Sequence, residues 1–443
     1  MTRFARPAGI ALAFALGLTL TAAGCTKQGQ SEGEDEKSEK PAAAADAPAA
    51  QEEPAIKASE DDCVGPLVRS GKPKKIAFEN WEFKVDGYLL TQLNGDPDEE
   101  IVVGVVSDTK ENTEANRKNL DKIIAFFERN KVDVIVHLGD IASTTPMPEE
   151  IEVPETDEEG NPLADDQRDR KRRRLINKAR RESMKQSFDD IVEVLSILAE
   201  TELPLLVISG NRECKTVFNS ALATLSEDYP NVFNMNIIRR ADLDDLDVIS
   251  MPGYHDPEYV HCPWDKCLYY PSDTLSLIKL AEEANSEKLL ISHGPPRQNH
   301  RDGIDVVSEG ANVGNKALTE AIRKGDIFFG AFGNIQEAGG KAVNLDGDNI
   351  IPQDTFVRSL YLNPGPADSM IWTMNDGTDS QGMAGVLHFV GNKAKYKIYR
   401  IGDSETPAPA APAEDEPAEE PAPEQAAEAA PAADEAGSDS GSE

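Results

Sequence analysis

The sequence has few basic residues relative to its acidic ones, few aromatic residues and only six histidines. Its 443 residues include 80 acidic and 45 basic side chains, which gives a formal net charge of −35. Residues 61–402 alone carry a net charge of −19. Such a surface repels polyanions, which argues against nucleic acid or anionic lipid as a partner of this region. The sequence also lacks a Cys-x-x-Cys pair, so a metal site of that type is excluded.

The first 24 residues are typical of a secretory signal. Two arginines precede an apolar run over residues 10–20, which is shorter than the roughly 20 residues that cross a membrane. The motif Ala22–Cys25 resembles a bacterial lipobox, in which the cysteine is lipidated and becomes the mature N-terminus. We therefore expect Cys25 to attach the chain to a membrane; a cleaved signal with a chance cysteine is the alternative. Thr26 follows in place of an aspartate, so resemblance to Gram-negative lipoproteins favours the outer membrane.

Two further segments lack the large apolar residues that a folded core needs. Thr26–Glu60 is rich in Ala, Glu, Pro, Gln and Ser, and Asp403–Glu443 repeats Pro-Ala-Glu themes without any aromatic residue. Neither segment buries enough surface to offset chain entropy, so we expect both to be disordered. The chain then divides into a signal (1–24), a lipidated linker (25–60), a folded domain (61–402) and an acidic tail (403–443).

Four cysteines besides the lipobox cysteine suggest two disulfides in an exported chain, and three pairings are compatible with that number. Cys262 and Cys267 flank a short Pro-Trp-Asp-Lys loop, so we expect them to pair. Cys63 then pairs with Cys214 by elimination, which would tie the start of the domain to one of its central loops. Four free thiols are the alternative.

Alternating apolar strands and amphipathic helices predict an α/β fold. A hairpin around residues 85–88 precedes a strand at 101–107, a helix at 112–130 and a strand at 132–138. This strand–helix–strand unit implies a parallel pair with a right-handed crossover. The remaining expected elements are a polar loop at 144–166, strands at 203–209, 247–251, 288–292, 327–332 and 360–363, helices at 216–225, 274–284 and 316–323, and a hairpin at 385–399.

A long helix expected at residues 167–200 changes character along its length. Its first half carries Lys171–Arg174 and the pair Arg180-Arg181, whereas its second half has an apolar face. The basic run predicts either a docking patch or a solvated helix face that pairs with the domain's own acidic residues. The second interpretation is favoured, because solvated charge runs are the commoner case.

Five polar residues each follow the C-terminal end of an expected strand. In an α/β sheet these strand ends gather along one edge, where ligands bind. Because turn-forming Asp and Asn are common at strand ends, no single one of these residues indicates a site. As an ordered set they predict one polar cluster, which consists of Asp108, Asp140, Asn211, His293 and Asn334.

The motifs around these residues resemble those of the calcineurin-like metallophosphoesterases, over about residues 100–402. That family's pattern is Asp-x-His, Gly-Asp, Gly-Asn-His-Glu, a lone His and Gly-His-x-His, in this order. The chain has, in the same order, Ser107–Lys110, Gly139-Asp140, Gly210–Glu213, His293–Pro296 and Gly333–Glu337. The resemblance implies a layered β-sandwich with flanking helices, and two metal ions that clamp a hydroxide for attack on phosphorus.

Four positions depart from the family pattern, because histidine is replaced at each of them. Lys110 and Gln336 stand where the resemblance implies histidine ligands of the first metal, and Asn334 stands where it implies one of the second. Arg212 replaces the histidine that assists the leaving group. An ammonium cannot bind a metal and a guanidinium cannot donate a proton at neutral pH, so the replacements remove much of the family's chemistry.

The candidate metal ligands that the resemblance leaves are rich in oxygen. They suit one weakly bound Mn²⁺, Mg²⁺ or Ca²⁺, or no metal at all. They are Asp108, Asp140, Asn211, His293, Asn334 and Gln336. Three further histidines in expected loops, His255, His261 and His300, are candidates for substitute ligands or ordinary loop residues.

Two functions are compatible with this altered set. The first is a pseudoenzyme tethered to the envelope, in which Lys110 and Arg212 bind an anion such as a phosphate-containing ligand, or a partner, without catalysis. The second is a metal-dependent phosphoester hydrolase with a single-metal or otherwise altered site. The sequence favours the first, because so much of the metal clamp is replaced.

Overall fold

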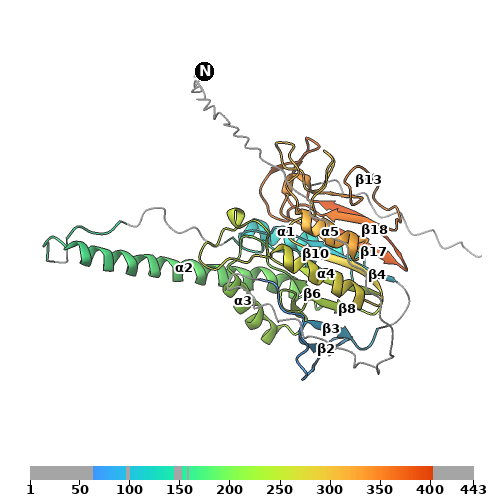
Figure 1. Ribbon diagram of the computed structural model, residues 1–443, viewed down its shortest axis with the longest axis horizontal. Coiled ribbons are helices and arrows are strands. Elements are labelled where there is room, and N and C mark those ends of the chain that lie inside the picture. The colour runs from blue at the N-terminus through green and yellow to red at the C-terminus, as the bar shows by residue number, and fades with distance from the viewer. Residues whose placement is uncertain (1–62, 96–99, 144–151, 157–158, 403–443) are drawn as a thin grey trace, which may run out of the picture. The chain divides into compact units, whose positions relative to one another are not determined.

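The computed structural model describes residues 63–95, 100–143, 152–156 and 159–402 (Figure 1). They form two β-sheets that pack face to face, with helices on the outer faces. The expected α/β architecture, a layered β-sandwich with flanking helices, is confirmed. Within these residues no helix is both long and apolar enough to cross a membrane. The expected signal, the lipidated Cys25, the linker and the acidic tail lie outside the described residues.

The smaller sheet supplies three of the strands that lead to the polar cluster. Its order is β18–β17–β4–β5–β6–β7, in which β4 to β7 are parallel and β17 pairs antiparallel with both β4 and β18. The strands are β4 (Glu100–Val106), β5 (Val134–His137), β6 (Leu205–Val207), β7 (Val232–Asn234), β17 (Met383–Val390) and β18 (Lys393–Arg400). Its outer face packs on α1 (Glu114–Arg129), α2 (Asp165–Ala199) and α3 (Lys215–Asp228).

The larger sheet supplies the other two strands of the cluster, β10 and β11, which are parallel neighbours. Its ten strands run in the order β1–β2–β3–β8–β9–β10–β11–β14–β12–β13. They are β1 (Lys74–Phe78), β2 (Trp81–Asp86), β3 (Leu89–Gln92), β8 (Arg240–Asp242), β9 (Leu246–Met251), β10 (Glu287–Ser292), β11 (Phe329–Phe332), β12 (Lys341–Val343), β13 (Ile350–Ile351) and β14 (Leu360–Asn363). Figure 1 shows α4 (Pro271–Glu283) and α5 (Lys316–Lys324) against this sheet.

Successive side chains of the central strands point to opposite faces of the sheet, so each strand packs both against the other sheet and against the helices. In β4, Val103 and Val105 point into the layer between the sheets, whereas Val102 and Val106 pack towards the helices. Both faces of the strand are therefore buried, which is typical of parallel strands covered on both sides. Each such side chain contributes roughly 1.5–3 kcal/mol relative to exposure, so this core fixes the positions of the strand ends.

Most of the expected elements are present within a few residues of their predicted bounds, including the hairpin at Asp86-Gly87 between β2 and β3. The structure adds short strands that the pattern did not mark, such as β7, β8 and the pair β15 (Trp372–Thr373) and β16 (Asp379–Ser380). Strand β8 has three residues, and its Arg240 is buried in an ion pair with Asp247. A charged three-residue strand carries no hydrophobic periodicity, which explains why it escaped prediction.

The expected disulfide pairing was wrong. The structure joins Cys63 to Cys267, with Cα atoms 4.7 Å apart, and Cys214 to Cys262, with Cα atoms 5.2 Å apart. The prediction that the four cysteines form two disulfides is confirmed. Neither of the expected pairs, Cys262–Cys267 and Cys63–Cys214, is formed.

The loop between the two neighbouring cysteines explains the difference. It wraps the N-terminus of α3, where Asp265 accepts hydrogen bonds from the backbone N–H groups of Lys215 (3.1 Å) and Thr216 (2.7 Å). These contacts satisfy donors that a helix start leaves free. Because the loop passes around the helix end, its two cysteines face different partners, and nearness in sequence does not bring them together.

We expect peptide mapping under non-reducing conditions to establish this pairing. Trypsin cleaves after Lys266, so Cys262 and Cys267 fall on different peptides. Mass spectrometry should find the Cys63 peptide joined to the Cys267 peptide, and the Cys214 peptide joined to the Cys262 peptide. A linkage between the Cys262 and Cys267 peptides would contradict the structure.

Candidate functional site

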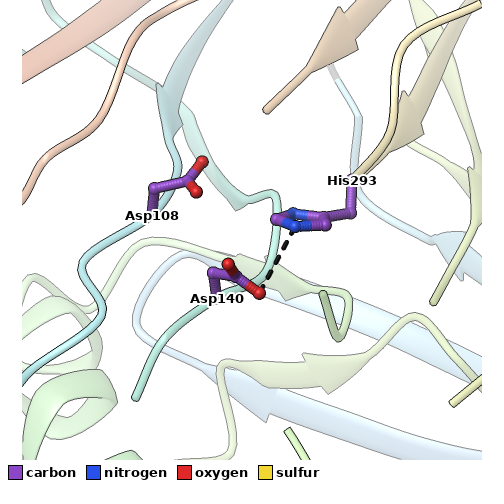
Figure 2. Close-up of side chains that lie close together, drawn as sticks. All are labelled: Asp108, Asp140 and His293. Carbon is purple, nitrogen blue, oxygen red and sulfur yellow. Dashed lines mark ion pairs between the residues drawn. The ribbon is translucent and has the colours of Figure 1, made fainter. Parts of the chain in front are cut away.

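The structure brings the five strand-end residues together at one edge of the two sheets. The backbone N–H of Asn334 donates to Asp108 Oδ2 (3.0 Å), which links the ends of β11 and β4 across the sandwich. The backbone N–H of Asn211 donates to Asp140 Oδ1 (3.0 Å), and His293 Nε2 lies 3.3 Å from the same oxygen. Figure 2 shows Asp108, Asp140 and His293 directed towards one another.

An unusual backbone conformation positions several of these side chains. Asp108, Lys110, Asp140 and Asn334 all have φ between 53° and 63°, the left-handed region that side-chain-bearing residues rarely adopt. Each such residue costs on the order of 1 kcal/mol, and the surrounding core must supply that energy. Four of them at one edge indicate that the fold holds these side chains in place at the expense of local stability.

Two glycines of the motifs are required by close packing. Gly139 has φ 94°, and a Cβ there would lie 2.4 Å from Gly210 N. A Cβ on Gly210 would lie 2.3 Å from Asp140 Oδ1. The Gly-Asp and Gly-Asn motifs therefore let two loops touch each other directly behind Asp140.

Asp140 is buried and is surrounded by cationic and N–H groups. Arg212 Nε lies 3.2 Å from its Oδ2, and its Oδ1 accepts hydrogen bonds from the backbone N–H groups of Asn211 and Arg212. Burial alone would raise the pKa of Asp140, but the charges of His293, Arg212 and Lys110 outweigh burial and hold it below its usual range. Asp140 is therefore ionised at neutral pH.

His293 is the cationic partner of Asp140. Its Nδ1 donates to the backbone oxygen of Leu138 (2.9 Å), and its Nε2 faces both Asp140 Oδ1 and Asn211 Oδ1 at 3.3 Å. Burial would lower the pKa of His293, but the Asp140 carboxylate raises it to about 9. In the absence of a bound metal ion this shift favours the imidazolium at neutral pH, whereas a metal ligand must be neutral.

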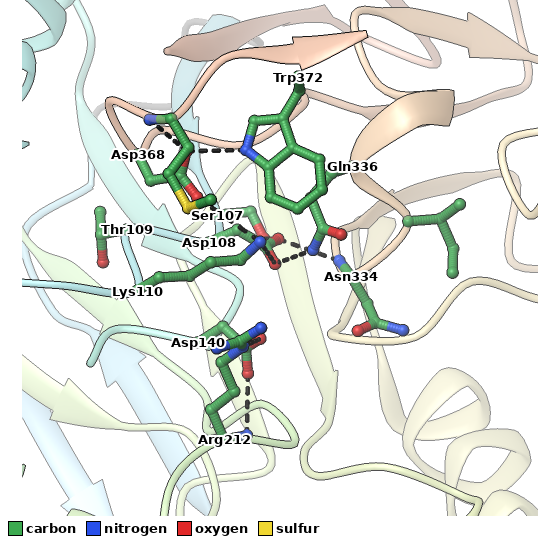
Figure 3. A network of polar contacts seen from close by, with 12 residues as sticks. Ser107, Asp108, Thr109, Lys110, Asp140, Arg212, Asn334, Gln336, Asp368 and Trp372 are labelled. Carbon is green, nitrogen blue, oxygen red and sulfur yellow. Dashed lines mark hydrogen bonds and ion pairs between the residues drawn. The ribbon is translucent and has the colours of Figure 1, made fainter. Parts of the chain in front are cut away.

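Asp108 is satisfied by neutral donors on both of its oxygens (Figure 3). Ser107 Oγ donates to Oδ2 at 2.6 Å, in addition to the Asn334 N–H, and Gln336 Nε2 donates to Oδ1 at 2.6 Å. Gln336 thus presents its amide nitrogen to the carboxylate. The Asn334 side chain donates its Nδ2 to the hydroxyl of Tyr254 at 3.0 Å.

Lys110 lies beneath this cluster and is 3% exposed. Its Nζ is 3.5 Å from Asp368 Oδ2, 4.0 Å from Asp108 Oδ1 and 4.1 Å from the centroid of the Trp372 ring. Trp372 Nε1 in turn donates to Asp368 Oδ1 (2.8 Å), as Figure 3 shows. The ammonium lies between two carboxylates and an aromatic face, but within the described residues neither Nζ nor Asp368 Oδ2 makes a hydrogen bond.

Asp368 and Trp372 were missed by the sequence interpretation. Both follow β14, whose C-terminal end lies beside that of β11 at the same edge of the sheet. Burial raises the pKa of Asp368 more than the Lys110 ammonium lowers it. The Asn363-Pro364-Gly365 motif after an apolar strand was the available signal, but the residues that complete the site come several positions later.

Glu213 supports the site from behind and is fully buried. Its two oxygens accept from the backbone N–H groups of Ile141 (2.5 Å) and Gly210 (2.8 Å), which joins the loops after β5 and β6. Burial and the nearby charge of Asp140 raise the pKa of Glu213 to about 7. It is a positioning residue, and the Gly-Asn-x-Glu motif contained it.

The ligand atoms present fit one metal ion but not two. One atom each from Asp108, Asp140 and His293 lie within 4.8 Å of one another, so this buried group could hold a metal ion. Within the described part of the chain it is the only group of this kind. A second ion would need ligands from Lys110 and Gln336, which offer an ammonium and an amide nitrogen to Asp108.

An open cleft of about 560 Å³ lies next to the cluster. Arg212 lines it, with a side chain 29% exposed, but Lys110 does not. The cleft also includes His255 and His261, whose pKa values burial lowers, and neither belongs to the buried ligand group. Its remaining polar lining is made of acidic, amide and hydroxyl side chains, which are Asp140, Asn211, Tyr254, Asp256, Tyr259, Ser308, Glu309, Asn334, Gln336 and Glu337.

The raised pKa of His293 predicts how stability depends on pH. The pKa of His293 is near 9 in the folded state and about 6.5 in the unfolded state. Protonation of His293 therefore stabilises the fold fully below pH 6.5, and this stabilisation is lost as pH rises through 9. Urea unfolding at pH 6, 7.5 and 9.5 should show a loss of up to about 3 kcal/mol. His293→Gln should remove most of this slope, and His388→Gln, remote from the site, should keep it. Stability that rises between pH 7 and 9 would contradict the ion pair, because that is the behaviour of a metal site.

The Lys110 position predicts a second effect on stability. Lys110→Met leaves Asp108 and Asp368 as buried carboxylates without their cation, and should cost about 3–5 kcal/mol in chemical unfolding. Adding Asp368→Asn should recover most of that loss. Lys118→Met, which removes an exposed ion pair with Glu114, should change stability by less than about 1 kcal/mol. If Lys110→Met is as mild as Lys118→Met, the ammonium does not balance these carboxylates.

No family model matches the sequence, and no curated protein sequence matches it. Several solved structures are similar to the chain at low identity. A dimetal phosphatase from Danio rerio is 11% identical, with a TM-score of 0.38, and the match covers 69% of this chain and 96% of that one. The protein TT1561 of Thermus thermophilus is 12% identical, with a TM-score of 0.39 and coverages of 67% and 98%.

GAP50, the anchor in the inner membrane complex of Plasmodium, is also 12% identical, with a TM-score of 0.39 and coverages of 70% and 87%. Because these TM-scores are below 0.5, the likeness transfers neither an activity nor a ligand to this chain. The structural neighbours of the chain are metallophosphoesterase-like and dimetal-phosphatase-like proteins of low identity.

Proposed function

We propose that this chain is a non-catalytic binding protein with a metallophosphoesterase-like fold. One observation carries the proposal: each of the two buried aspartates is already matched by cations of the chain itself. Asp140 lies against His293 and Arg212, and Asp108 lies near Lys110. Removing a charge from water is costly unless it is paired, and here side chains supply the pairing that a metal ion would otherwise give.

The second support concerns the leaving group of a hydrolysis reaction. No proton donor stands at the position where the motif resemblance implies one. Arg212 stays protonated at neutral pH, so it cannot give up a proton during a reaction. Its guanidinium is also engaged, since Nη1 donates to Ser143 Oγ (2.8 Å) and Nε pairs with Asp140. Hydrolysis would require both the activated water and the acid to come from elsewhere.

The third support is the cleft, which provides a place for a ligand beside the charge-balanced cluster. Arg212 is the part of the cluster that combines a fixed positive charge with exposure to the cleft. An anionic ligand would share this guanidinium with Asp140 and Ser143. We propose a phosphate-containing ligand or an acidic group of a partner protein as the occupant. Lipidation at Cys25 would hold this binding domain at the bacterial envelope, with the outer membrane favoured.

A single-metal phosphoester hydrolase is the second candidate function. The specific observation in its favour is the group Asp108, Asp140 and His293, with Asn211 Oδ1 facing the same imidazole nitrogen. These residues would hold one divalent ion such as Mn²⁺ or Mg²⁺, which would supply Lewis-acid chemistry when bound. His293 must first lose its proton, so metal binding would compete with the ion pair and would be weak at neutral pH.

Metal content and activity of the full chain separate these candidates. Purified protein incubated with 1 mM Mn²⁺ and then desalted should hold less than about 0.1 metal ion per chain, and its melting temperature should not rise with Mn²⁺. It should cleave aryl phosphates no faster than an Asp140→Asn control. Near-stoichiometric metal, together with hydrolysis that Asp140→Asn abolishes, would refute the non-catalytic proposal.

A variant with added metal ligands serves as a positive control for the expected absence of metal binding. Lys110→His with Gln336→His removes the internal cation and the amide donor of Asp108, and adds two imidazoles at the same backbone positions. This variant should take up metal where the natural chain does not. If neither protein binds metal although both are folded, the replaced side chains are not what excludes the ion.

A further inference from the structure

The first half of α2 forms an exposed, strongly basic arm, which we define as residues 165–182. The buried residues of α2 begin only at Ser183, so the arm makes little contact with the sandwich. Figure 1 shows this part of α2 extending well beyond the other helices. At 1.5 Å per residue, the 18 residues of the arm reach about 27 Å. That length exceeds the screening distance of about 8 Å at physiological salt, so the tip is electrostatically separate from the acidic domain.

The charge of the arm is opposite to that of the rest of the chain. Between residues 168 and 181 the sequence has nine basic residues and one acidic residue, in a protein of net charge −35. The ion pairs of the arm among the described residues are Arg170 with Asp166 and Lys178 with Glu182. Arg180 stacks 5.3 Å from the Trp264 ring at the base of the arm. The arm's remaining cations make no ion pair with a described residue, and they are Arg168, Lys171, Arg172, Arg173, Arg174 and Arg181.

The arm has little packing to stabilise it. Apart from Leu175, Ile176 and Ala179 its side chains are polar, whereas most helical stability in proteins comes from the packing of an apolar face. Here the spacing adds repulsion, because Arg170 and Arg174 are four residues apart and Arg174 and Lys178 are too. The expected pairing with acids of the domain occurs only at Arg170 with Asp166 and Lys178 with Glu182 among the described residues, and both of these acids belong to α2 itself. An anionic segment lying along the arm would remove this repulsion.

We propose that the occupant is the chain's own C-terminal tail, residues 403–443. The tail has 13 acidic residues and no basic residue in 41 positions, which complements the arm in sign and in number. It begins directly after β18 ends at Arg400, so it is tethered to the same domain. By its length alone, an unstructured segment of 41 residues has an average end-to-end distance of roughly 35 Å, which exceeds the roughly 27 Å length of the arm. The tether gives an effective concentration near the millimolar range.

Covalent attachment to the same domain favours the tail over an external polyanion as the occupant of the arm. A free acidic partner must compete with a segment that is covalently tethered to the same domain and therefore has a high effective concentration. The tail is therefore the favoured occupant of the arm, and a competitor would need a higher charge density to displace it. We call this proposed contact between the arm and the tail the clasp.

Hydrogen–deuterium exchange of the full chain tests the clasp. The key variant replaces the tail's 13 Asp and Glu residues by Asn and Gln, which keeps its length. At 50 mM NaCl the arm's amides should exchange at least about fivefold faster in this variant than in the natural chain. In 500 mM NaCl the two proteins should exchange alike, because salt screens the contact. Amides of α1 should be unaffected, and an unchanged melting temperature should confirm that the domain is intact.

A binding assay identifies the occupant independently. A fluorescein-labelled poly-glutamate peptide of about 20 residues should bind the neutral-tail variant at least about tenfold more tightly than the natural chain. Adding Arg172→Gln, Arg173→Gln and Arg174→Gln to the neutral-tail variant should abolish that binding. Equal arm exchange with and without the acidic tail would overturn the proposal. So would equal binding of the peptide by both proteins, which would show that the arm serves an external acidic partner.

Discussion

The ion pairing of Asp140 with His293 and Arg212 is the interaction on which the rest of the site depends. Asp140 is 1% exposed, and the loops around it are packed so closely that two glycines are required behind it. A buried carboxylate in such a place is stable only when cations and N–H donors surround it. Three strand ends, those of β5, β6 and β10, deliver these groups, so the sheet geometry and the charge balance support each other.

The same arrangement shows how the backbone of the site is held at the edge of the two sheets. Four residues at the site keep a strained left-handed conformation, which is expected where a fold must aim side chains at one point. In this chain the aimed groups contact one another directly. Lys110 is held between Asp108 and Asp368 beneath the ring of Trp372, and Gln336 donates to Asp108. Under the proposed function, side chains supply the positive charge that the motif resemblance assigns to metal ions, and Arg212 lines an open cleft beside them.

Much of the fold and the position of the cluster could be predicted from the sequence, because both follow from local pattern. Apolar runs marked the strands, and polar residues directly after them marked the edge where strand ends meet. Asp368 and Trp372 could not be found in this way, since they sit in a segment without periodicity and reach Lys110 only in three dimensions. The cysteine pairing failed for the same kind of reason: the Cys262–Cys267 loop is short, but it passes around the start of α3, so contact follows the path of the loop and not its length.

The protonation state of the His293 ring tests the central claim most directly, because a side-chain cation and a metal ligand differ there by one proton. Nitrogen NMR of ¹⁵N-histidine-labelled full chain can resolve it, since the sequence has only six histidines and His293→Gln assigns the signal. The account predicts that at pH 7.5 both ring nitrogens carry protons, and that the ring titrates with a pKa of about 9. A neutral ring at pH 7.5, whose Nε2 signal shifts when equimolar Zn²⁺ is added, would contradict the account.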